Sequence, residues 1–259
     1  MKNVIRFTVL ITFFSIFFGC AYMPDNGISK AIVNQERLKK VNTIALLDVA
    51  NPSKYWMGDP HSGVAAGLFG PILSLGTANH EKNDIFRRLK FSTTATEDLR
   101  AALKKEGFKV ILLNAKRPEG AKSKLFNDYS TVMNINADAI LDVAPIHIGY
   151  REKIGEMHFS KGALSPDVSV EFRLVSTSDK KIIVDSNVHF SSFDYRESHL
   201  GSWGGPILVG PADHIFKDKE SVERNPDEAL RRMKYAVNKV AEFIASFLAL
   251  KEKVGREGK

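Results

Sequence analysis

The sequence predicts an α/β fold: a β-α-β-α-β core sheet, extended by an antiparallel hairpin and covered by a long C-terminal helix. Three observations lead to this prediction. Near-continuous apolar runs alternate with segments of helical periodicity over residues 43–148. Residues 168–190 alternate between apolar and polar side chains around a central turn. An apolar stripe with a helical period then occupies residues 225–248.

The apolar runs are expected to be strands with both faces buried, because parallel strands covered by helices lack an alternating pattern. They comprise residues 43–49 (TIALLDV), 108–113 (FKVILL) and 139–148 (AILDVAPIHI). Helices are expected over residues 94–106 and 123–134, and Gly107 stands at the C-terminal cap of the first. This order indicates consecutive β-α-β units with right-handed crossovers.

The alternating segment predicts a hairpin with one face on the core and the other in water. Asp185, Asn187 and His189 share one face of its second strand, which we expect to be the wet one. His147 and His189 fall within predicted strands, where histidines are more often core or cross-strand residues than metal ligands. The final helix is expected to start at Asn225 as its N-cap, with Pro226 in the first helical position. We interpret its apolar stripe as core rather than as a membrane-lying surface, because the sheet needs a cover.

The N-terminal segment, residues 1–19, has the features of a secretory signal peptide. Lys2 and Arg6 form a basic start, an apolar run covers residues 7–18, and a glycine precedes Cys20. A transmembrane helix needs about 20 apolar residues, so this run is too short for an uncleaved membrane anchor. We therefore expect residues 1–19 to be removed on export.

Cys20 is the only cysteine in the chain, so it cannot form an intrachain disulfide. Its place directly after Gly19 resembles the lipobox of bacterial lipoproteins, although Phe17 and Phe18 depart from the usual residues. The resemblance implies that the Cys20 sulfur is lipidated and that acyl chains anchor the protein to a membrane. In such lipoproteins an alanine after the cysteine, here Ala21, favours the outer membrane, with the protein facing the periplasm.

The mature chain is expected to comprise a tether at residues 20–40 and a single periplasmic α/β domain at residues 41–259. Removing Lys2 and Arg6 lowers the formal charge from +7 to +5. This surplus is spread along the chain without a run of like charges, which is typical of an ordinary solvated surface. The alternative is contact with anionic headgroups or cell-wall polymers. A nucleic-acid partner is not expected for an exported protein.

Two glycine-rich apolar segments interrupt the predicted core elements, at residues 63–76 and 201–211. Apolar loops are unusual because connecting segments normally run over a wet surface. Three interpretations are open: the loops bury their own side chains against the fold, they bind a partner or a second copy, or they dip into a membrane leaflet. The candidate partner or membrane contacts are Leu68, Phe69, Ile72, Leu73, Trp203, Ile207 and Leu208.

Motifs of known catalytic chemistry are missing from the sequence. The seven histidines do not form HExxH or another metal-ligand spacing, and there is no second cysteine. The sequence contains neither a Gly-x-Ser-x-Gly elbow nor a phosphate-binding loop. We therefore expect no metal, no cofactor and no enzymatic activity. Asp142, within a predicted strand, is interpreted either as a satisfied buried carboxylate or as a functional one.

The order of elements resembles the amino-terminal domain of TolB and its relatives, which include lipoprotein activators of penicillin-binding proteins and the periplasmic part of the curli-secretion lipoprotein. The residues that carry the resemblance are 43–49, 94–113 and 137–143, with the hairpin and the final helix. It implies a non-enzymatic adaptor or assembly component that binds envelope proteins or itself. The alternative is an oligomeric secretion or translocation component of the outer membrane, which needs strands of about 9–11 residues to cross it.

Overall fold

The computed structural model describes residues 32–58, 84–115, 117, 122–152, 162–193 and 205–249. Its strands are β1 (Ile32–Val33), β2 (Thr43–Leu47), β3 (Trp56–Met57), β4 (Lys109–Leu113), β5 (Ala139–Glu152), β6 (Leu164–Ser176), β7 (Ile182–Ser191) and β8 (Ile207–Val209). Its helices are α2 (Gln35–Leu38), α5 (Asp84–Leu89), α6 (Phe91–Lys105), α7 (Lys219–Arg224) and α8 (Pro226–Ala249). Short 3-10 turns occupy Ser130–Val132 and Ala212–His214.

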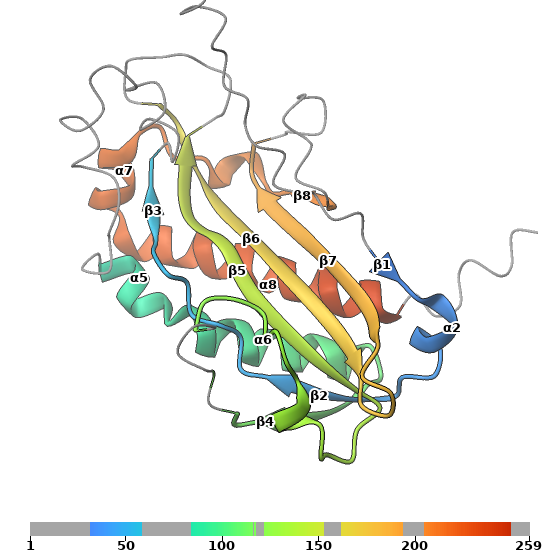
Figure 1. Ribbon diagram of the computed structural model, residues 1–259. Coiled ribbons are helices and arrows are strands. Elements are labelled where there is room, and N and C mark those ends of the chain that lie inside the picture. Colours follow the sequence, from blue (N-terminus) through green and yellow to red (C-terminus); the bar gives the residue numbers. More distant parts are fainter. Residues whose placement is uncertain are drawn as a thin grey trace, which may run out of the picture.

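The described strands form one open sheet in the order β1-β7-β6-β5-β2-β4, in which β3 also pairs with β5 and β8 with β7. The two long helices, α6 and α8, pack side by side over one face of this sheet (Figure 1). The predicted fold class is therefore confirmed: a mixed α/β fold with an open sheet and a long C-terminal helix.

The parallel part of the sheet forms as the apolar runs predict. β2 lies between β4 and β5 and is parallel to both. Gly107, directly after α6, has a φ of +90°, a conformation that glycine adopts without steric cost. The amides of Gly107 and Phe108 donate to the carbonyls of Lys104 and Leu103, and these bonds end the helix and turn the chain into β4.

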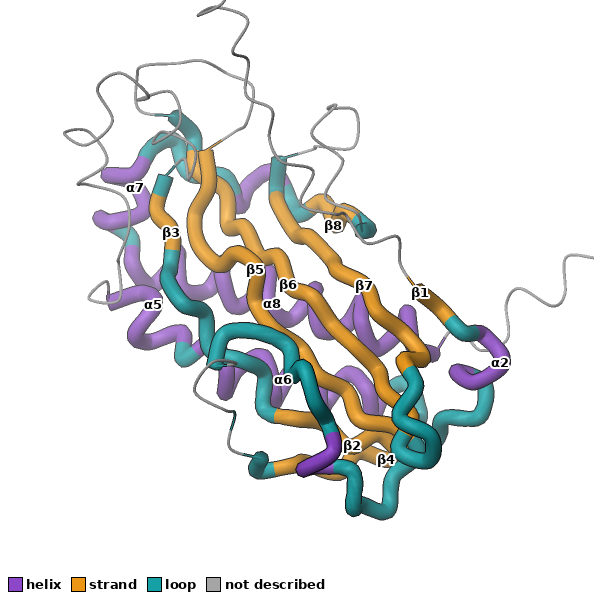
Figure 2. Tube along the Cα trace, viewed as in Figure 1, coloured by secondary structure: helices purple, strands orange, loops and turns teal. Residues whose placement is uncertain are grey.

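The helix predicted over residues 123–134 is wrong, because only a 3-10 turn forms there, at Ser130–Val132. Its apolar side chains are buried nonetheless: Phe126 and Tyr129 pack on the face of the sheet away from α6 and α8. The Phe126 amide donates to the Asp142 carboxylate at 2.7 Å, and Asp128 accepts the Ser130 amide at 2.8 Å. Side chains that bond to nearby backbone in this way compete with helix formation. Figure 2 shows the resulting loop crossing in front of the sheet.

The predicted hairpin is longer than its sequence pattern suggested. β5 and β6 are antiparallel over nearly their whole lengths, and β6 pairs in the same way with β7. The register of β5 shifts between Pro145 and His147, so Ile146 is the extra residue of a bulge. Before the bulge in the sequence, the side chains of Ala139, Leu141 and Val143 face the helices. After the bulge, those of Ile148 and Tyr150 do so. The bulge therefore turns His147 onto the opposite face.

Helix α8 begins at Pro226, as predicted, and closes the core against the sheet. The Asn225 side chain donates to the Ser221 carbonyl at 2.8 Å, so it also ends α7. One large apolar cluster joins the sheet to α5, α6 and α8, and it includes Tyr150, Phe172 and Met233. Among the described residues, none of the helices is both long enough and apolar enough to span a membrane.

Candidate functional site

A cluster of buried ionisable groups lies on the face of the sheet opposite the long helices. Asp167 on β6 is fully buried. Its Oδ1 lies 3.5 Å from His147 Nε2 on β5, and its Oδ2 lies 3.3 Å from His189 Nε2 on β7. The Nη1 of Arg151, also on β5, is 3.7 Å from Oδ2. His147, Arg151 and His189 are at most 6 % exposed, so four ionisable side chains share an interior site.

Strand register brings these side chains together. His147 and His189 both lie opposite Ser169, one on each neighbouring strand of β6. Asp167 is two residues away on β6, on the same face, so both imidazoles reach it diagonally. The bulge after Pro145 is essential to this geometry, because without the extra residue His147 would point toward the helices.

The cluster contains one pair of opposite charges and a histidine whose neutral form is favoured. The Arg151 guanidinium offsets the Asp167 carboxylate, and burial lowers the pKa of His189 so that its neutral form is favoured. The hydroxyls of Ser165 and Ser191 lie beside the cluster and accept the amides of Ser192 at 2.8 Å and Phe193 at 3.2 Å. These bonds fix the chain where it leaves β7. Within the described ranges, no group of three His, Cys, Asp or Glu side chains is arranged to hold a metal.

A stack of side chains connects the cluster to the surface. The Trp56 ring on β3 stacks on the His147 ring, with centroids 5.6 Å apart, and Lys54 Nζ lies 3.8 Å above the indole. Gly149 permits this arrangement, because a Cβ there would lie 2.2 Å from the Trp56 carbonyl oxygen. A cavity of about 150 Å³ opens at this point. It is smaller than the 300–1,000 Å³ typical of small-molecule sites.

Asp142 is the second buried carboxylate, and the structure places it in a separate network. It forms an ion pair with Arg117 and accepts hydrogen bonds from the Phe126 amide at 2.7 Å and the Tyr129 hydroxyl at 3.0 Å. Arg117 also donates to the Asp48 carbonyl at 2.9 Å. Of the two interpretations of Asp142, the satisfied buried carboxylate is the one that the structure supports. Its partners fasten the 122–134 loop to the sheet.

β4 forms one edge of the sheet that the described strands make. β4 pairs with β2 on one side and is the last strand on the other side among the described residues. The Lys109 amide donates to Asn42 of the segment leading into β2, so by alternation the backbone groups of Val110 and Leu112 point outward. The Leu112 side chain is 40 % exposed. An apolar edge of this kind is a template for pairing with another chain.

The opposite edge carries the described part of the second glycine-rich segment. β8 (Ile207–Val209) pairs with the upper end of β7, and β1 pairs with its lower part. Leu208 packs against the main core, Ile207 is half-buried, and Val209 is 40 % exposed. A Cβ at Gly205 would lie 1.8 Å from Asn187 Oδ1, so the glycine allows the chain to approach β7 closely.

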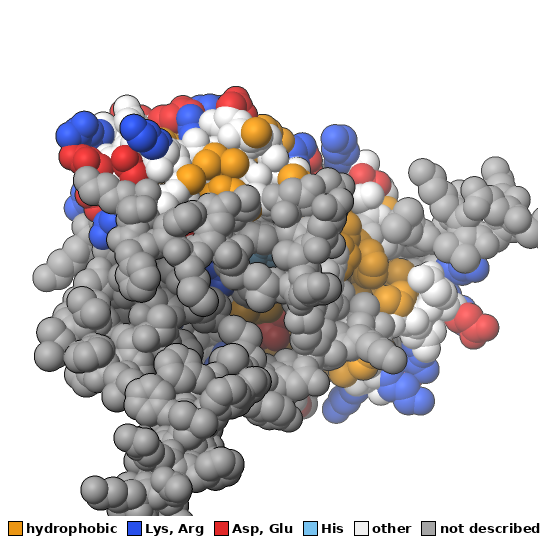
Figure 3. Space-filling view, turned by 90° about the horizontal axis from the view of Figure 1, so that it is seen from above, with side chains coloured by type: hydrophobic (Ala, Val, Ile, Leu, Met, Phe, Trp, Pro, Cys, Tyr) orange, Lys and Arg blue, Asp and Glu red, His pale blue; other side chains and the backbone are white. Residues whose placement is uncertain are grey.

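Exposed apolar side chains lie along this second edge. Ile32 is 51 % and Ile182 is 38 % exposed. Figure 3, viewed from above, shows hydrophobic side chains gathered on the right, where β1 lies in Figure 1. The other predicted site residues lie outside the described residues: Cys20, Leu68, Phe69, Ile72, Leu73 and Trp203.

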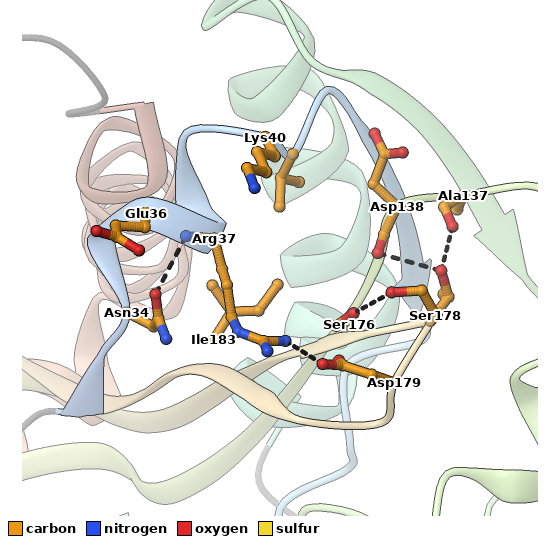
Figure 4. Close-up of a pocket in the computed structure, with 12 residues that line it drawn as sticks. Asn34, Glu36, Arg37, Lys40, Ala137, Asp138, Ser176, Ser178, Asp179 and Ile183 are labelled. Atoms are coloured by element: carbon orange, nitrogen blue, oxygen red, sulfur yellow. Dashed lines mark hydrogen bonds and ion pairs between the residues drawn. The ribbon is translucent and has the colours of Figure 1, made fainter.

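A hollow of about 650 Å³ lies at the end of the sheet where α2 meets the turn between β6 and β7. Figure 4 shows Arg37 and Asp179 pointing toward each other across it, with 2.5 Å between Nη1 and Oδ2. The bond from Arg37 lowers the pKa of Asp179 to about 2. Asp138 accepts the backbone amides of Asn42 at 2.9 Å and Thr43 at 2.8 Å. These acidic groups on the wall are therefore engaged within the protein.

Sequence reasoning missed the Asp167 cluster as a unit. The face of Asp185, Asn187 and His189 is not the wet face expected, because His189 is 2 % exposed and the other two are half-buried. The interpretation of His147 and His189 as core or cross-strand residues is confirmed. The signal was present in β6, where Ser165, Asp167 and Ser169 put polar side chains at every second position.

Comparisons with known proteins give only distant structural likenesses. No protein family matches the chain, and a search of curated proteins finds no significant match. Among solved structures, the PelC dodecamer from Paraburkholderia phytofirmans is 12 % identical, covers 81 % of this chain and 88 % of its own, and has a TM-score of 0.37. A protein from Xanthomonas campestris is 7 % identical, with coverages of 82 % and 86 % and a TM-score of 0.40. A lipoprotein from Neisseria meningitidis is 14 % identical, with coverages of 61 % and 90 % and a TM-score of 0.25. These likenesses assign neither a family nor a function.

Proposed function

We propose that the protein is a non-enzymatic, lipid-anchored protein of the outer membrane that faces the periplasm and acts as a protein-binding adaptor or assembly component. The location is supported by the sequence: a signal peptide at residues 1–19, a lone cysteine at position 20 and Ala21 after it. The first described element begins at Ile32, close enough to Cys20 for a short tether to join lipid and fold.

The open edge of β4 is the observation that supports a protein-binding role. A strand that is apolar from Val110 to Leu113, and that pairs with no other described strand on its outer side, is a site prone to pairing with another chain. Globular proteins usually protect such edges with charges, bulges or prolines, and the only charged residue in β4 is Lys109, at its start. An extended segment of a partner protein can satisfy these backbone groups by adding a strand.

The absence of an enzymatic role is supported by the missing catalytic motifs and by the state of Asp142. Asp142 is bonded to three partners, and a group that is satisfied in this way stabilises the fold and is not poised to accept a substrate. We infer that the Asp142 network is structural. Asp167 differs, because its charge is offset by Arg151 at 3.7 Å but neither of its oxygens accepts a hydrogen bond from the described residues.

A photo-activatable amino acid at position 112 tests the partner-binding role in native cells. We expect irradiation to crosslink a specific protein, either an envelope protein or a second copy of this chain, which mass spectrometry identifies. The matched control carries the same amino acid at position 146, because Ile146 is also an exposed apolar residue, at 49 %, but lies on a bulge within the sheet. Equal crosslinking from both positions would contradict the proposal.

Lipid anchoring is tested separately by mass. Protein isolated from its native cells is expected to start at Cys20 and to carry acyl chains there, and Cys20→Ser is expected to release it from membranes. A native chain that still begins at Met1, or that has no acyl mass at position 20, would overturn the proposed location.

The second candidate function is an oligomeric secretion or translocation component of the outer membrane. Its support is that the sheet has two unlike edges with exposed apolar residues, β4 on one side and β1 with β8 on the other. Joining unlike edges of successive copies builds a ring or a filament. The native mass in detergent separates the two functions: a closed ring of many copies supports this one, and a monomer or dimer supports the adaptor.

The glycine-rich segments remain proposed contact surfaces for a partner or a membrane. Because Leu208 packs against the core, its replacement would disturb the fold. Phe69→Ser with Ile72→Ser is the cleaner test for residues 63–76, and Val209→Ser tests the exposed end of residues 201–211. We expect these changes to weaken association without changing the thermal midpoint, and unchanged association would remove the segments from the proposal.

A further inference from the structure

Basic side chains gather at one end of the molecule. Strand register places the starts of β2, β4 and β5 and the turn between β6 and β7 at this end, together with α2. Residues 36–42, 104–109 and 177–181 and Asp138 form it, and we call it the basic end. They contain eight cations and four acids: Arg37, Lys39, Lys40, Lys104, Lys105, Lys109, Lys180 and Lys181 against Glu36, Glu106, Asp138 and Asp179.

The lysines of the basic end have no ion pairs within the part of the chain that the structure describes, so their charges add to one another. Arg37 pairs with Asp179, but none of the seven lysines lies within ion-pair distance of a carboxylate. Asp138 is bound to backbone amides instead. The end therefore presents positive charge that the fold itself does not use.

The other end of the molecule has the opposite character. Around α7 and the start of α8, Lys219, Arg224 and Arg231 each pair with a glutamate one helical turn away. Figure 3 shows basic and acidic side chains interspersed there, at the upper left. Charge is thus compensated at the α7 end and uncompensated at the basic end.

The N-terminal segment enters the fold near the basic end. Ile32 pairs with Asp185, which is only a few residues from the turn between β6 and β7. Cys20 precedes Ile32 by so few residues that a fully extended chain would span about 40 Å at most. A lipid at Cys20 would therefore hold this end, rather than the α7 end, nearer to the membrane.

We propose that the basic end binds the anionic phospholipid headgroups of the membrane in which the Cys20 lipid is inserted. This inference rests on the proposed lipid anchoring. Lysines close to an anionic surface each strengthen binding about fivefold. A lipid anchor combined with a basic surface gives firmer attachment than either alone. The contact would orient the strands roughly perpendicular to the membrane surface. The edge of β4 would then stay accessible to a protein partner.

The test uses the mature chain, residues 20–259, with Cys20→Ser, so that no acyl chain contributes. We expect it to co-sediment with phosphatidylcholine vesicles that contain phosphatidylglycerol, to release at high salt, and to ignore pure phosphatidylcholine vesicles. The variant Lys39→Gln, Lys109→Gln, Lys180→Asn, Lys181→Gln should bind at least about a hundredfold more weakly. Asparagine is chosen at position 180 because the φ of Lys180 is +59°, a conformation that asparagine tolerates.

The matched control is Lys217→Gln, Lys219→Gln, Arg224→Gln, Arg231→Gln, which removes the same charge at the α7 end. It should bind the anionic vesicles as the parent does, and both variants should keep the parent's circular dichroism spectrum. Three results would overturn the proposal: no binding by the parent, equal binding to neutral vesicles, or equal losses in the two variants. Lipidation is judged from the acyl mass at Cys20, so the two proposals can fail separately.

Discussion

Asp167 is a residue at which a single change should be strongly destabilising. Asp167→Asn keeps the size of the side chain but removes the carboxylate that lies 3.7 Å from the buried Arg151 guanidinium. Breaking a buried ion pair from one side typically costs about 3–5 kcal/mol in the free energy of unfolding. Urea denaturation at neutral pH measures this loss. Asp179→Asn serves as the control, since its ion pair with Arg37 is exposed, and a loss as large as that of Asp167→Asn would contradict the interpretation.

His189 should make the stability of the fold depend on pH. Burial lowers its pKa below the usual value near 6.5, while Asp167 partly offsets this effect. The unfolded chain therefore takes up a proton at a higher pH than the folded chain. The stabilisation is complete above about pH 6.5 and is lost as the pH falls below it.

The measurement is the urea midpoint from neutral pH to pH 5, with His189→Gln as the variant. We expect the variant to lose less stability than the parent over this interval. His214, whose pKa is also lowered by burial, keeps its own share of the pH dependence in both proteins. Parallel curves for the two proteins would show that His189 does not contribute.

For single residues, the sequence predicted correctly which side chains share a face of a strand, but not whether that face is buried. Asp185, Asn187 and His189 do share one face of β7, because alternation in a strand assigns side chains to faces. Alternation does not tell whether that face is covered, and His189 is buried. For Asp142 the sequence left two interpretations open, because its partners Arg117 and Tyr129 come from irregular segments whose positions no local pattern specifies.

Strand β3 depends on Gly149, and this dependence can be tested at the scale of one element. Gly149→Ala would bring a Cβ to 2.2 Å from the Trp56 carbonyl oxygen, so β3 must move away from β5. We expect a loss of about 1–3 kcal/mol in the free energy of unfolding. The Trp56 fluorescence, recorded with Trp203→Phe in the background, should shift because the indole leaves the His147 ring.

Gly162→Ala is the matched control for Gly149→Ala. Its Cβ would meet only the Glu152 side chain, at 3.2 Å, and the end of a flexible side chain can move aside. We expect both the fluorescence and the stability of this variant to stay near those of the parent. A Gly149→Ala protein that resembled the control would show that β3 does not need the close approach.

Elements with strong local patterns were predictable, and those made by long-range contacts were not. The parallel arrangement of β2, β4 and β5 and the start of α8 at Pro226 followed from apolar runs and cap residues. The helical spacing of apolar residues in 123–134 was misleading, because the Phe126 amide bonds to Asp142 instead of to a helical carbonyl. β3 and β8 escaped prediction because two or three residues carry no periodicity.

At the scale of the whole molecule, the fold is organised around α8. This helix contacts α5, α6, α7, β6 and β7, and its buried residues belong to the same apolar cluster as β2 and β5. A single core shared by the sheet and the helices supports the proposal that residues 41–259 form one domain. It also implies that a destabilising substitution on α8 lowers the stability of distant parts of the sheet.

Met233→Ala tests this shared core. Met233 is fully buried on α8, and truncating such a side chain typically costs about 2–5 kcal/mol. We expect the urea midpoint to fall by the same amount whether unfolding is followed by circular dichroism or by Trp56 fluorescence in a Trp203→Phe background. Trp56 lies on β3, which pairs with β5, and its ring stacks on His147 on the face of the sheet opposite α8. The fluorescence midpoint would therefore stay unchanged if the sheet and the helices unfolded as separate units. If the urea midpoints measured by circular dichroism and by fluorescence fall together, the sheet does not stay folded once the helices unpack from it. The reason is that the apolar face of β5, β6 and β7 has no cover other than the helices among the described residues.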